Sequence, residues 1–460
     1  MYLADSRSTK TGDSHSTKAA VVPDTRPGRR SAAVPGTVLA LGAVSLITDI
    51  SSEMVTAVLP LYVVTALGLS PLGFGLLDGI NNGVGALVRL AGGHLADRGG
   101  GRSHKAVAGL GYGLSALCKP LLLLAHTLPL ISAVLAVDRT GKGLRTAPRD
   151  AMISLATAPE RRGRAFGVHR AMDTTGALLG PLVAFAVLRA TVDGYDAVFA
   201  VSGCVAALGV LVLVLFVPRR IATTVAGPRP EPPPERDAVP SPDPARPALR
   251  ERGAVPSPDP ARPALRDALG LLRRPELRRL TLCATLLGLT TVSDSFLYLL
   301  LQREGDLPAH LFPLLPLGTA AVFLLLAVPL GALADRVDRR LLFLAGHGVL
   351  LLGYGLVLSP WHGIPAVIAV LLLHGTFYAA TDGVLAAATA GAVPAQHQGA
   401  GQALVGTGQA LARFACSLAF GAAWSEWGGR TALAMTAAAL AVSAAVAAYV
   451  LRTTDEVKPA

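Results

Sequence analysis

The feature that most constrains this chain is a succession of apolar segments, each about as long as a membrane-crossing helix. Such a helix needs about 20 mostly apolar residues. A window of that length finds twelve candidates in the 460 residues, at 36–66, 72–95, 105–125, 128–152, 165–189, 196–218, 280–301, 310–334, 340–359, 363–390, 400–423 and 430–451. Because lipid cannot satisfy free backbone polar groups, these segments are predicted to be transmembrane helices.

Composition supports a bilayer as the surrounding medium. The chain is 52% hydrophobic and only 15% charged, whereas soluble domains are about 25% charged. The formal net charge of +11 could indicate nucleic acid. However, the basic residues lie between the apolar segments, which is typical of cytoplasmic membrane loops. We therefore expect no nucleic-acid partner and a chain surrounded by lipid.

The distribution of Lys and Arg predicts the orientation in the membrane. Basic residues concentrate in the N-terminal tail and in the loops after the second, fourth and eighth segments, whereas the intervening loops hold few. Positive loops stay inside, so both termini are predicted to be cytoplasmic in a multi-pass protein of the cell inner membrane. The loop after the tenth segment, which has no Lys or Arg, is a local exception.

The sequence divides into five predicted parts. A Pro-rich stretch between the sixth and seventh segments repeats Ala238–Arg250 as Ala254–Arg266, and such sequence cannot bury a core. The predicted parts are a disordered cytoplasmic tail (1–34), an N-terminal six-helix bundle (35–218), a cytoplasmic linker (219–279), a C-terminal six-helix bundle (280–451) and a cytoplasmic tail (452–460).

The two predicted bundles share a sequence repeat. Gly93-His-Leu-Ala-Asp97-Arg98 returns as Gly331-Ala-Leu-Ala-Asp335-Arg336. The two copies lie at equivalent places, after the second segment of each half. Repeated halves are a common architecture among secondary transporters.

These residues resemble the major facilitator superfamily, over nearly all of 36–451. The loop after the second segment matches the family pattern G-x-L-a-D-r-x-G-r-R/K, although Gly101 stands where a basic residue is usual. The resemblance implies twelve helices in two pseudo-symmetric bundles, alternating access, a monomer, no cofactor and energy from a proton gradient. It also implies a conformational lock formed by Gly93, Asp97, Arg98, Arg102, Gly331, Asp335 and Arg336.

The fourth segment carries a second resemblance. Arg139, Lys142 and Gly143 are similar to the family pattern R-x-x-q-G, with Lys142 in place of Gln. In relatives this arginine is linked to proton coupling. The surrounding run Asp138–Asp150 looks like that of a poorly characterised prokaryotic branch for which the resemblance implies no particular substrate.

The fifth segment resembles the family's antiporter motif G-x-x-x-G-P at Gly176, Gly180 and Pro181. Ala184 and Phe185 stand where the motif continues with two glycines. The motif favours export. A face of small residues that lets another helix pack closely gives the same spacing, so a purely structural role stays open.

Ionisable residues inside the apolar segments are the candidates for proton coupling, because they are costly in lipid and usually face water. Asp49 and Glu53 share one helix face, and two carboxylates this close do not both ionise easily. The predicted proton-coupling residues are Asp49, Glu53, Arg139 and Asp173. Alternatively, each carboxylate pairs with a fixed cation.

Further polar residues are predicted to line a substrate cavity. Asp138, Lys142, Arg145 and Arg149 recur every three or four residues and form a stripe. The stripe either attracts anions or is neutralised by nearby carboxylates in a salt-bridge network. The predicted cavity residues are Asp78, Asn82, Lys142, Arg145, Asp294, Tyr378, Asp382, Gln409 and Arg413.

Three functions remain in competition at this point. The leading hypothesis is proton-coupled efflux of a small organic solute by alternating access. The second keeps the fold but takes up solute by symport or exchanges organic anions. The third is a membrane-embedded enzyme or a non-transporting sensor, which the sequence disfavours because it has no H-E-x-x-H, G-x-S-x-G or P-loop motif and no metal-ligand spacing.

Overall fold

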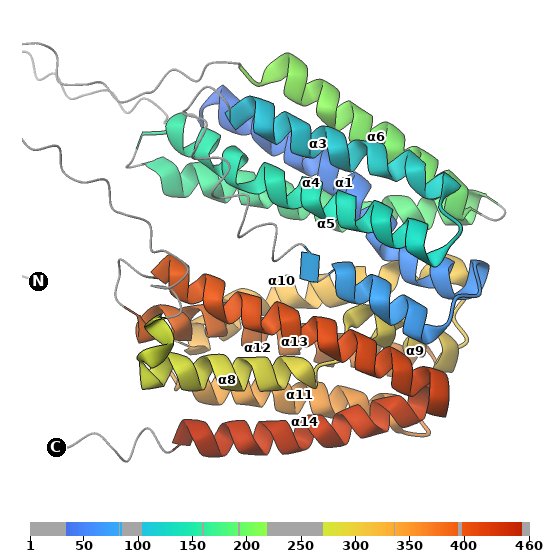
Figure 1. Cartoon of the computed structure of the whole chain (residues 1–460), viewed down its shortest axis with the longest axis vertical. Helices are drawn as coiled ribbons and strands as arrows, with labels where there is room; N and C mark the ends of the chain where they lie inside the picture. Colours follow the sequence, from blue (N-terminus) through green and yellow to red (C-terminus); the bar gives the residue numbers. More distant parts are fainter. Residues whose placement is uncertain are drawn as a thin grey trace, which may run out of the picture. The chain divides into compact units, whose positions relative to one another are not determined.

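A computed structural model describes residues 34–81, 83–84, 104–158, 161–191, 194–218, 270–334, 336–393 and 398–452. The regular structure within these ranges is helical throughout, with no strand. Figure 1 shows the helices in sequence colours. An all-helical membrane architecture was predicted, and it is confirmed.

The first half contains five helices described over their full length. They are α1 (Gly36–Leu61), α3 (His104–Leu121), α4 (Leu128–Leu155), α5 (Arg162–Ala190) and α6 (Tyr195–Phe216). A π-helical turn, η1 (Tyr62–Ala66), extends α1, and residues 71–81 form the described part of a further helix. At the start of α3, Lys105 Nζ donates to the carbonyls of Val214 and Val217 and so satisfies the end of α6.

The described part of the second half contains seven helices. They are α8 (Pro275–Leu289), α9 (Asp294–Glu304), α10 (Leu314–Ala334), α11 (Arg339–Leu358), α12 (Ile364–Ala392), α13 (Gln398–Trp427) and α14 (Gly429–Arg452). Short 3₁₀ turns lie at Leu271–Arg273 (η4) and Ala309–Leu311 (η5), and η2 (Leu122–Leu124) lies in the first half.

The seventh predicted span differs from the structure in two ways. The sequence placed a linker up to residue 279 and one helix at 280–301, but α8 begins at Pro275 and the span breaks between Leu289 and Asp294. Pro fits the first turn of a helix, and Glu276 beside it suits the positive end of the helix dipole. The break brings Ser293 and Asp294 to the start of the second helix, α9.

Nine helices in the described ranges are long and apolar enough to cross a membrane. α4 and α13, at 28 and 30 residues, are also long enough. α4 carries a stripe of charged residues, which lowers its hydropathy. Large apolar side chains such as Leu325 and Val328 are 74% and 79% exposed, as expected for helices whose outer surface faces lipid. The chain is a multi-pass membrane protein.

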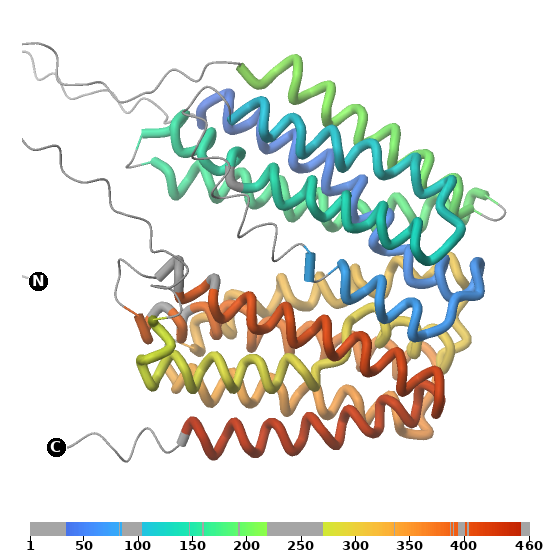
Figure 2. Tube along the Cα trace, viewed as in Figure 1, coloured from blue at the N-terminus to red at the C-terminus, as the bar shows by residue number. Residues whose placement is uncertain are grey.

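The helices of the two halves pair in the same pattern. In the first half α1 packs against α5 and α6, and α3 packs against α4 and α6. In the second half α8 packs against α13 and α14, and α11 packs against α12 and α14. Each pair in one half has its counterpart six segments later, as can be followed along the traces in Figure 2. The sequence repeat therefore corresponds to a repeated fold.

The halves contact each other where α1 and α13 end. A side chain at Gly75 would collide with the carbonyl oxygen of Ser417, and one at Gly421 would lie 2.6 Å from the carbonyl oxygen of Pro71. The Leu72 amide donates to Ser425 Oγ at 3.1 Å. The small residues at Gly75, Gly79 and Gly83 thus let the second helix approach α13 closely.

Aromatic side chains seal the same contact. The Phe74 ring packs edge-on against Phe296, with centroids 4.9 Å apart, and Phe296 in turn packs against Phe420 and Trp424. All four side chains are buried. This cluster, with the glycine contacts, joins the two halves through a closely packed layer.

Candidate functional site

A polar cavity of about 360 Å³ lies in the first half, between the second helix, α1, α4 and α5. α4 contributes most of the lining, because residues three and four apart share one helix face. The lining residues are Asp49, Asn81, Arg139, Lys142, Gly143, Arg145, Thr146, Arg149, Arg170 and Asp173. Its volume falls within the range of small-molecule sites, which are about 300–1,000 Å³.

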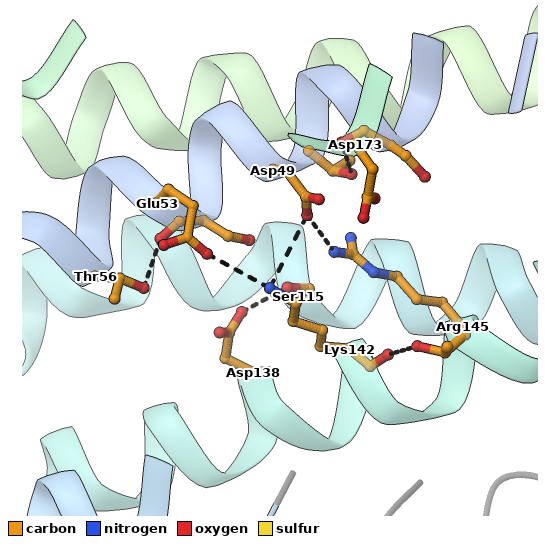
Figure 3. Close-up of polar contacts among 12 residues, drawn as sticks. Asp49, Glu53, Thr56, Ser115, Asp138, Lys142, Arg145 and Asp173 are labelled. Atoms are coloured by element: carbon orange, nitrogen blue, oxygen red, sulfur yellow. Dashed lines mark hydrogen bonds and ion pairs between the residues drawn. The ribbon is translucent and has the colours of Figure 1, made fainter. Parts of the chain in front are cut away.

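Cations of α4 reach the two carboxylates of α1. Arg145 donates to Asp49 at 3.2 Å, and Lys142 Nζ lies 4.0 Å from Asp49 and 3.6 Å from Glu53. Figure 3 shows the Lys142 amine between the two carboxylates. Asp49 and Glu53 do share a helix face, as predicted, but a cation bridges them.

Asp173 of α5 is the second carboxylate that lines the cavity, with Asp49. Figure 3 shows Asp173 pointing toward Asp49 and Arg145. Two neighbouring carboxyl groups can share a hydrogen bond only if one of them holds a proton. Arg149 lies 3.6 Å from Asp173 and 3.0 Å from Asp150, so the pair is flanked by cations.

The predicted salt-bridge network is therefore present in the cavity. Lys142, Arg145 and Arg149 each have a carboxylate within 4.0 Å. Arg139 and Arg170 have none among the residues that the structure describes. Among the described residues, Arg139 donates a long hydrogen bond, 3.4 Å, to Thr56 Oγ1, and its buried Nε finds no partner among them.

Asp138, the first residue of the predicted α4 stripe, faces away from this cavity. It accepts from Lys119 at 2.9 Å and from Ser115 at 2.5 Å, and the Lys119 and Asp138 side chains are 3% and 4% exposed. This buried pair joins α3 to α4 behind the cavity wall. Removing either partner would leave an uncompensated buried charge, so the pair fixes how α4 presents its cations.

A second polar cluster lies in the C-terminal half around Asp294. This residue follows the break in the seventh span, and its Oδ1 accepts from Tyr378 at 2.6 Å and from His374 Nε2 at 3.0 Å. The Asp294 side chain is 40% exposed, and its position at the start of α9 suits a carboxylate. His374 Nδ1 is buried with no partner in the described part of the chain.

The other predicted residues of the C-terminal half line a small cavity of about 30 Å³. Tyr378, Asp382, Gln409 and Arg413 lie there together. The Arg413 charge interacts with Asp294, Asp382 and, across to the first half, Asp78. The structure thus brings these residues together, in a smaller cavity than that of the first half.

Asp78, a predicted cavity residue, lies at the contact between the halves and lines a smaller cavity of about 30 Å³ that shares Asn81 and Arg139 with the polar cavity. It is buried and accepts from Ser417 Oγ at 2.6 Å. Its carboxylate also interacts with the Ser293 and Ser295 side chains at the start of α9. Asn82 lies outside the described residues, and its neighbour Asn81 lines the cavity instead.

The predicted conformational lock falls mostly outside the described residues. Gly93, Asp97, Arg98, Arg102 and Asp335 are not described. Gly331 lies in α10 with open space around its Cα, and Arg336 is exposed in the turn that follows. The lock stays a prediction.

The glycines of the antiporter-like motif pack against α1. A side chain at Gly176 would collide with the Leu46 backbone, and one at Gly180 would meet Ile50 and Glu53. Pro181 is buried next to them. The motif therefore holds α5 close enough to α1 for Asp173 to reach Asp49.

The sequence missed Arg170 and Asn81 as cavity residues. Each lies near a predicted residue in the sequence. Arg170 is three positions before Asp173, and Asn81 is one position before Asn82. The three-residue spacing of Arg170 and Asp173 on one helix was a usable signal. For Asn81, which depends on how the second helix is rotated about its axis, the sequence offered no such signal.

The Major Facilitator Superfamily model matches residues 41–321 and 301–460. An uncharacterized MFS-type transporter of Methanocaldococcus jannaschii is 39% identical over 142 residues, 30% of this chain and 34% of that protein. An uncharacterized protein of Mycobacterium tuberculosis is 33% identical over 195 residues, 42% and 45% of the two chains. The chain thus spans less than half the length of these curated relatives.

Solved transporters share the fold at low sequence identity. A bacterial homolog of the human lysosomal transporter Spinster superposes with a TM-score of 0.69 and 15% identity, over 92% of this chain and 98% of that one. The nucleoside transporter NupG superposes with a TM-score of 0.70 and 12% identity, over 90% and 99%.

Proposed function

The chain belongs to the major facilitator superfamily and is a transporter, not an enzyme; from this premise we propose that it exports a small organic solute in exchange for protons. The observation that carries the proposal is that two carboxylates, Asp49 and Asp173, line one polar cavity beside the cations of α4. The cell inner membrane is the proposed location, because the proton gradient acts there.

The proposed orientation in the membrane determines which side of the membrane the cavity faces. With both termini in the cytoplasm, α1 and α13 end on the outer side, where the glycine contacts and the aromatic cluster join the halves. The described arrangement then closes the outer side and represents the state that faces the cytoplasm. Export requires the halves to rock so that this contact opens.

The proposed proton site lies where two helices of one bundle meet the cations of a third. Asp49 belongs to α1, Asp173 to α5, and Lys142, Arg145 and Arg149 to α4. A proton on the pair leaves fewer negative charges for the α4 cations, and its loss restores them. The ion pairs between α4 and its neighbours therefore change in strength with proton occupancy, which is how a proton can bias one conformation.

A second candidate function is the exchange of organic anions, with uptake by symport as its variant. The observation that favours it is the cationic surplus of the cavity, where Arg139 and Arg170 lack carboxylate partners among the described residues. Such a cavity is neutral only when an anion occupies it. Exchange would then need solute on both sides of the membrane and no proton gradient.

Everted membrane vesicles test the proposal. Vesicles are acidified inside by respiration, a pH-sensitive dye is quenched, and a library of organic acids, amino acids and cationic drugs is added one compound at a time. We expect at least one compound to restore fluorescence in wild-type vesicles but not in Asp173→Asn vesicles. Glu426→Gln removes an exposed carboxylate at the end of α13 and serves as the control that keeps the response.

Three other outcomes are informative. Solute uptake that ignores a protonophore would contradict proton coupling. Further acidification on adding solute, instead of recovery, would indicate symport. Uptake that depends only on a preloaded organic anion would establish the exchange reaction.

A further inference from the structure

We infer that the solute carries an oxyanion group, a carboxylate or a phosphate, and that Arg139 and Arg170 bind it. The inference rests on the proposed function only in taking the polar cavity as the solute site. It makes no use of the direction in which protons move. It rests on the ion pairs, the lining and the unmet hydrogen-bonding groups of the cavity.

The charges of the lining do not balance. Five lining side chains are cationic, Arg139, Lys142, Arg145, Arg149 and Arg170, and two are carboxylates, Asp49 and Asp173. Glu53 and Asp150, outside the lining, neutralise Lys142 and Arg149 as well. Arg139 and Arg170 are left without an ion pair in the described ranges.

Arg139 has hydrogen-bonding capacity that the described residues do not use. Its Nε is buried with no partner in the part of the chain that the structure describes, and its one polar contact there is 3.4 Å long. The nearest acidic residue in sequence, Asp138, is occupied by Lys119 and Ser115. Because a buried polar group without a hydrogen bond is costly, a ligand oxygen at Arg139 would stabilise this arrangement.

Arg170 supplies a second guanidinium from a different helix. It is an exposed residue of α5 that lines the same cavity, three residues before Asp173. Guanidinium groups bind carboxylates and phosphates through paired hydrogen bonds. Because both arginines line one cavity from separate helices, each can bind an oxyanion group of the solute and select it over a neutral group of the same shape.

The lining of the polar cavity suits a hydrated solute, and apolar side chains line a separate cavity of about 30 Å³ that shares Asn81 and Arg139 with it. Every lining residue except Gly143 has a polar or charged side chain. Ligand pockets for drug-like molecules are lined mainly by apolar and aromatic groups. A small, hydrated organic anion fits this chemistry, and an inside-negative membrane potential favours its exit.

Thermal stability of the purified full-length protein in detergent tests the inference without transport. The probes are succinate, citrate and glycerol 3-phosphate. Their uncharged counterparts succinamide and glycerol, and the cation putrescine, are compared at equal ionic strength. We expect the anions to raise the melting temperature in a saturable way and the other three compounds not to.

Charge-removing variants locate the site. Arg170→Gln and Arg139→Gln should each weaken apparent anion affinity about 10- to 100-fold, the effect of losing hydrogen bonds to a charged group. Arg170→Lys should recover part of it. Arg164→Gln removes an exposed arginine from the same helix, away from the cavity lining, and should bind as the wild type does. If Arg139→Gln fails to fold, Arg170→Gln alone decides.

Equal stabilisation by succinate and succinamide, or by none of the anions, would overturn the inference. So would anion binding that both Arg→Gln variants retain. Failure of the proposed function looks different: anions would bind through Arg170, yet the vesicles would show no proton movement. Conversely, proton exchange with neutral or cationic solutes alone would support the proposed function and contradict the inference that the solute is an anion.

Discussion

The two halves of the molecule share a helix-pairing pattern but differ in how they hold charge. In the first half, carboxylates of α1 and α5 meet cations of α4 through ion pairs around a cavity of about 360 Å³. In the second half, Asp294 is held by hydrogen bonds from His374 and Tyr378, and the cavity is about 30 Å³. A duplicated scaffold therefore supports two different chemistries.

The halves also differ in how closely their helices cross. Gly176 and Gly180 of α5 rest on the backbone of α1. The corresponding helix α13 meets α8 through side chains, because Gly408 faces Thr285 Oγ1 and Gly288 faces the Ala412 Cβ. The tighter crossing belongs to the half whose polar cavity is lined by ion pairs, where small shifts of a helix would break contacts.

The largest expected effect comes from breaking the ion pairs of the first half. Asp49→Asn leaves Arg145, whose side chain is 4% exposed, without its closest carboxylate. Loss of one partner of a buried pair costs about 3–5 kcal/mol, so the free energy of unfolding in mixed micelles should fall by that order. The double variant Asp49→Asn/Arg145→Gln should recover much of it. Equal losses in the single and double variants would contradict the pairing.

The next effect tests the difference in helix crossing. Gly176→Ala should lower the free energy of unfolding by about 1–3 kcal/mol, as overpacking does, because its new methyl group meets backbone. Gly408→Ala should cost less, since the Thr285 side chain can rotate away. Gly167→Ala, in open space on α5, is the control and should be neutral or slightly stabilising. A larger loss for Gly408→Ala would reverse the comparison.

A smaller effect is expected at the hydrogen-bonded carboxylate of the second half. Asp294→Asn retains an oxygen acceptor for Tyr378 but removes the charge. A hydrogen bond to a charged group stabilises a protein by about 1 kcal/mol more than one between neutral groups. Chemical denaturation should therefore show a loss of that order in the free energy of unfolding. Tyr378→Phe should cost a similar amount, and the two changes together should be less than additive. Full additivity would show that the two groups do not interact.

The smallest effect is expected at Asp382. This carboxylate is exposed, and among the described residues its charge interacts with Arg413 but forms no ion pair within 4.0 Å. Asp382→Asn should change the free energy of unfolding by no more than about 0.5 kcal/mol, as surface substitutions do. The same measurement on Asp49→Asn provides the matched case from the other half. Comparable losses at both positions would mean that the halves do not differ in the way described.

Much of the fold could be predicted from the sequence, because the lengths of the apolar segments and the repeated motifs can be read from local sequence alone. The described spans lie close to the predicted ranges, and Asp49, Lys142 and Arg145 do converge. Contacts that depend on how each helix is rotated about its axis could not be predicted from the sequence. The pairing of Asp173 with Arg149 in the polar cavity, the burial of Asp78 against Ser417 and the break before Asp294 each arise from packing between helices.

Infrared spectroscopy of the purified protein would test most directly whether Asp49 and Asp173 share a proton. Titration in mildly acidic buffer should show the carbonyl band of a protonated carboxylic acid. We predict that this band is lost in both Asp49→Asn and Asp173→Asn and retained in Asp382→Asn and Glu426→Gln. A spectrum that is the same in all five proteins would contradict the shared proton and remove the basis for proton coupling through this pair.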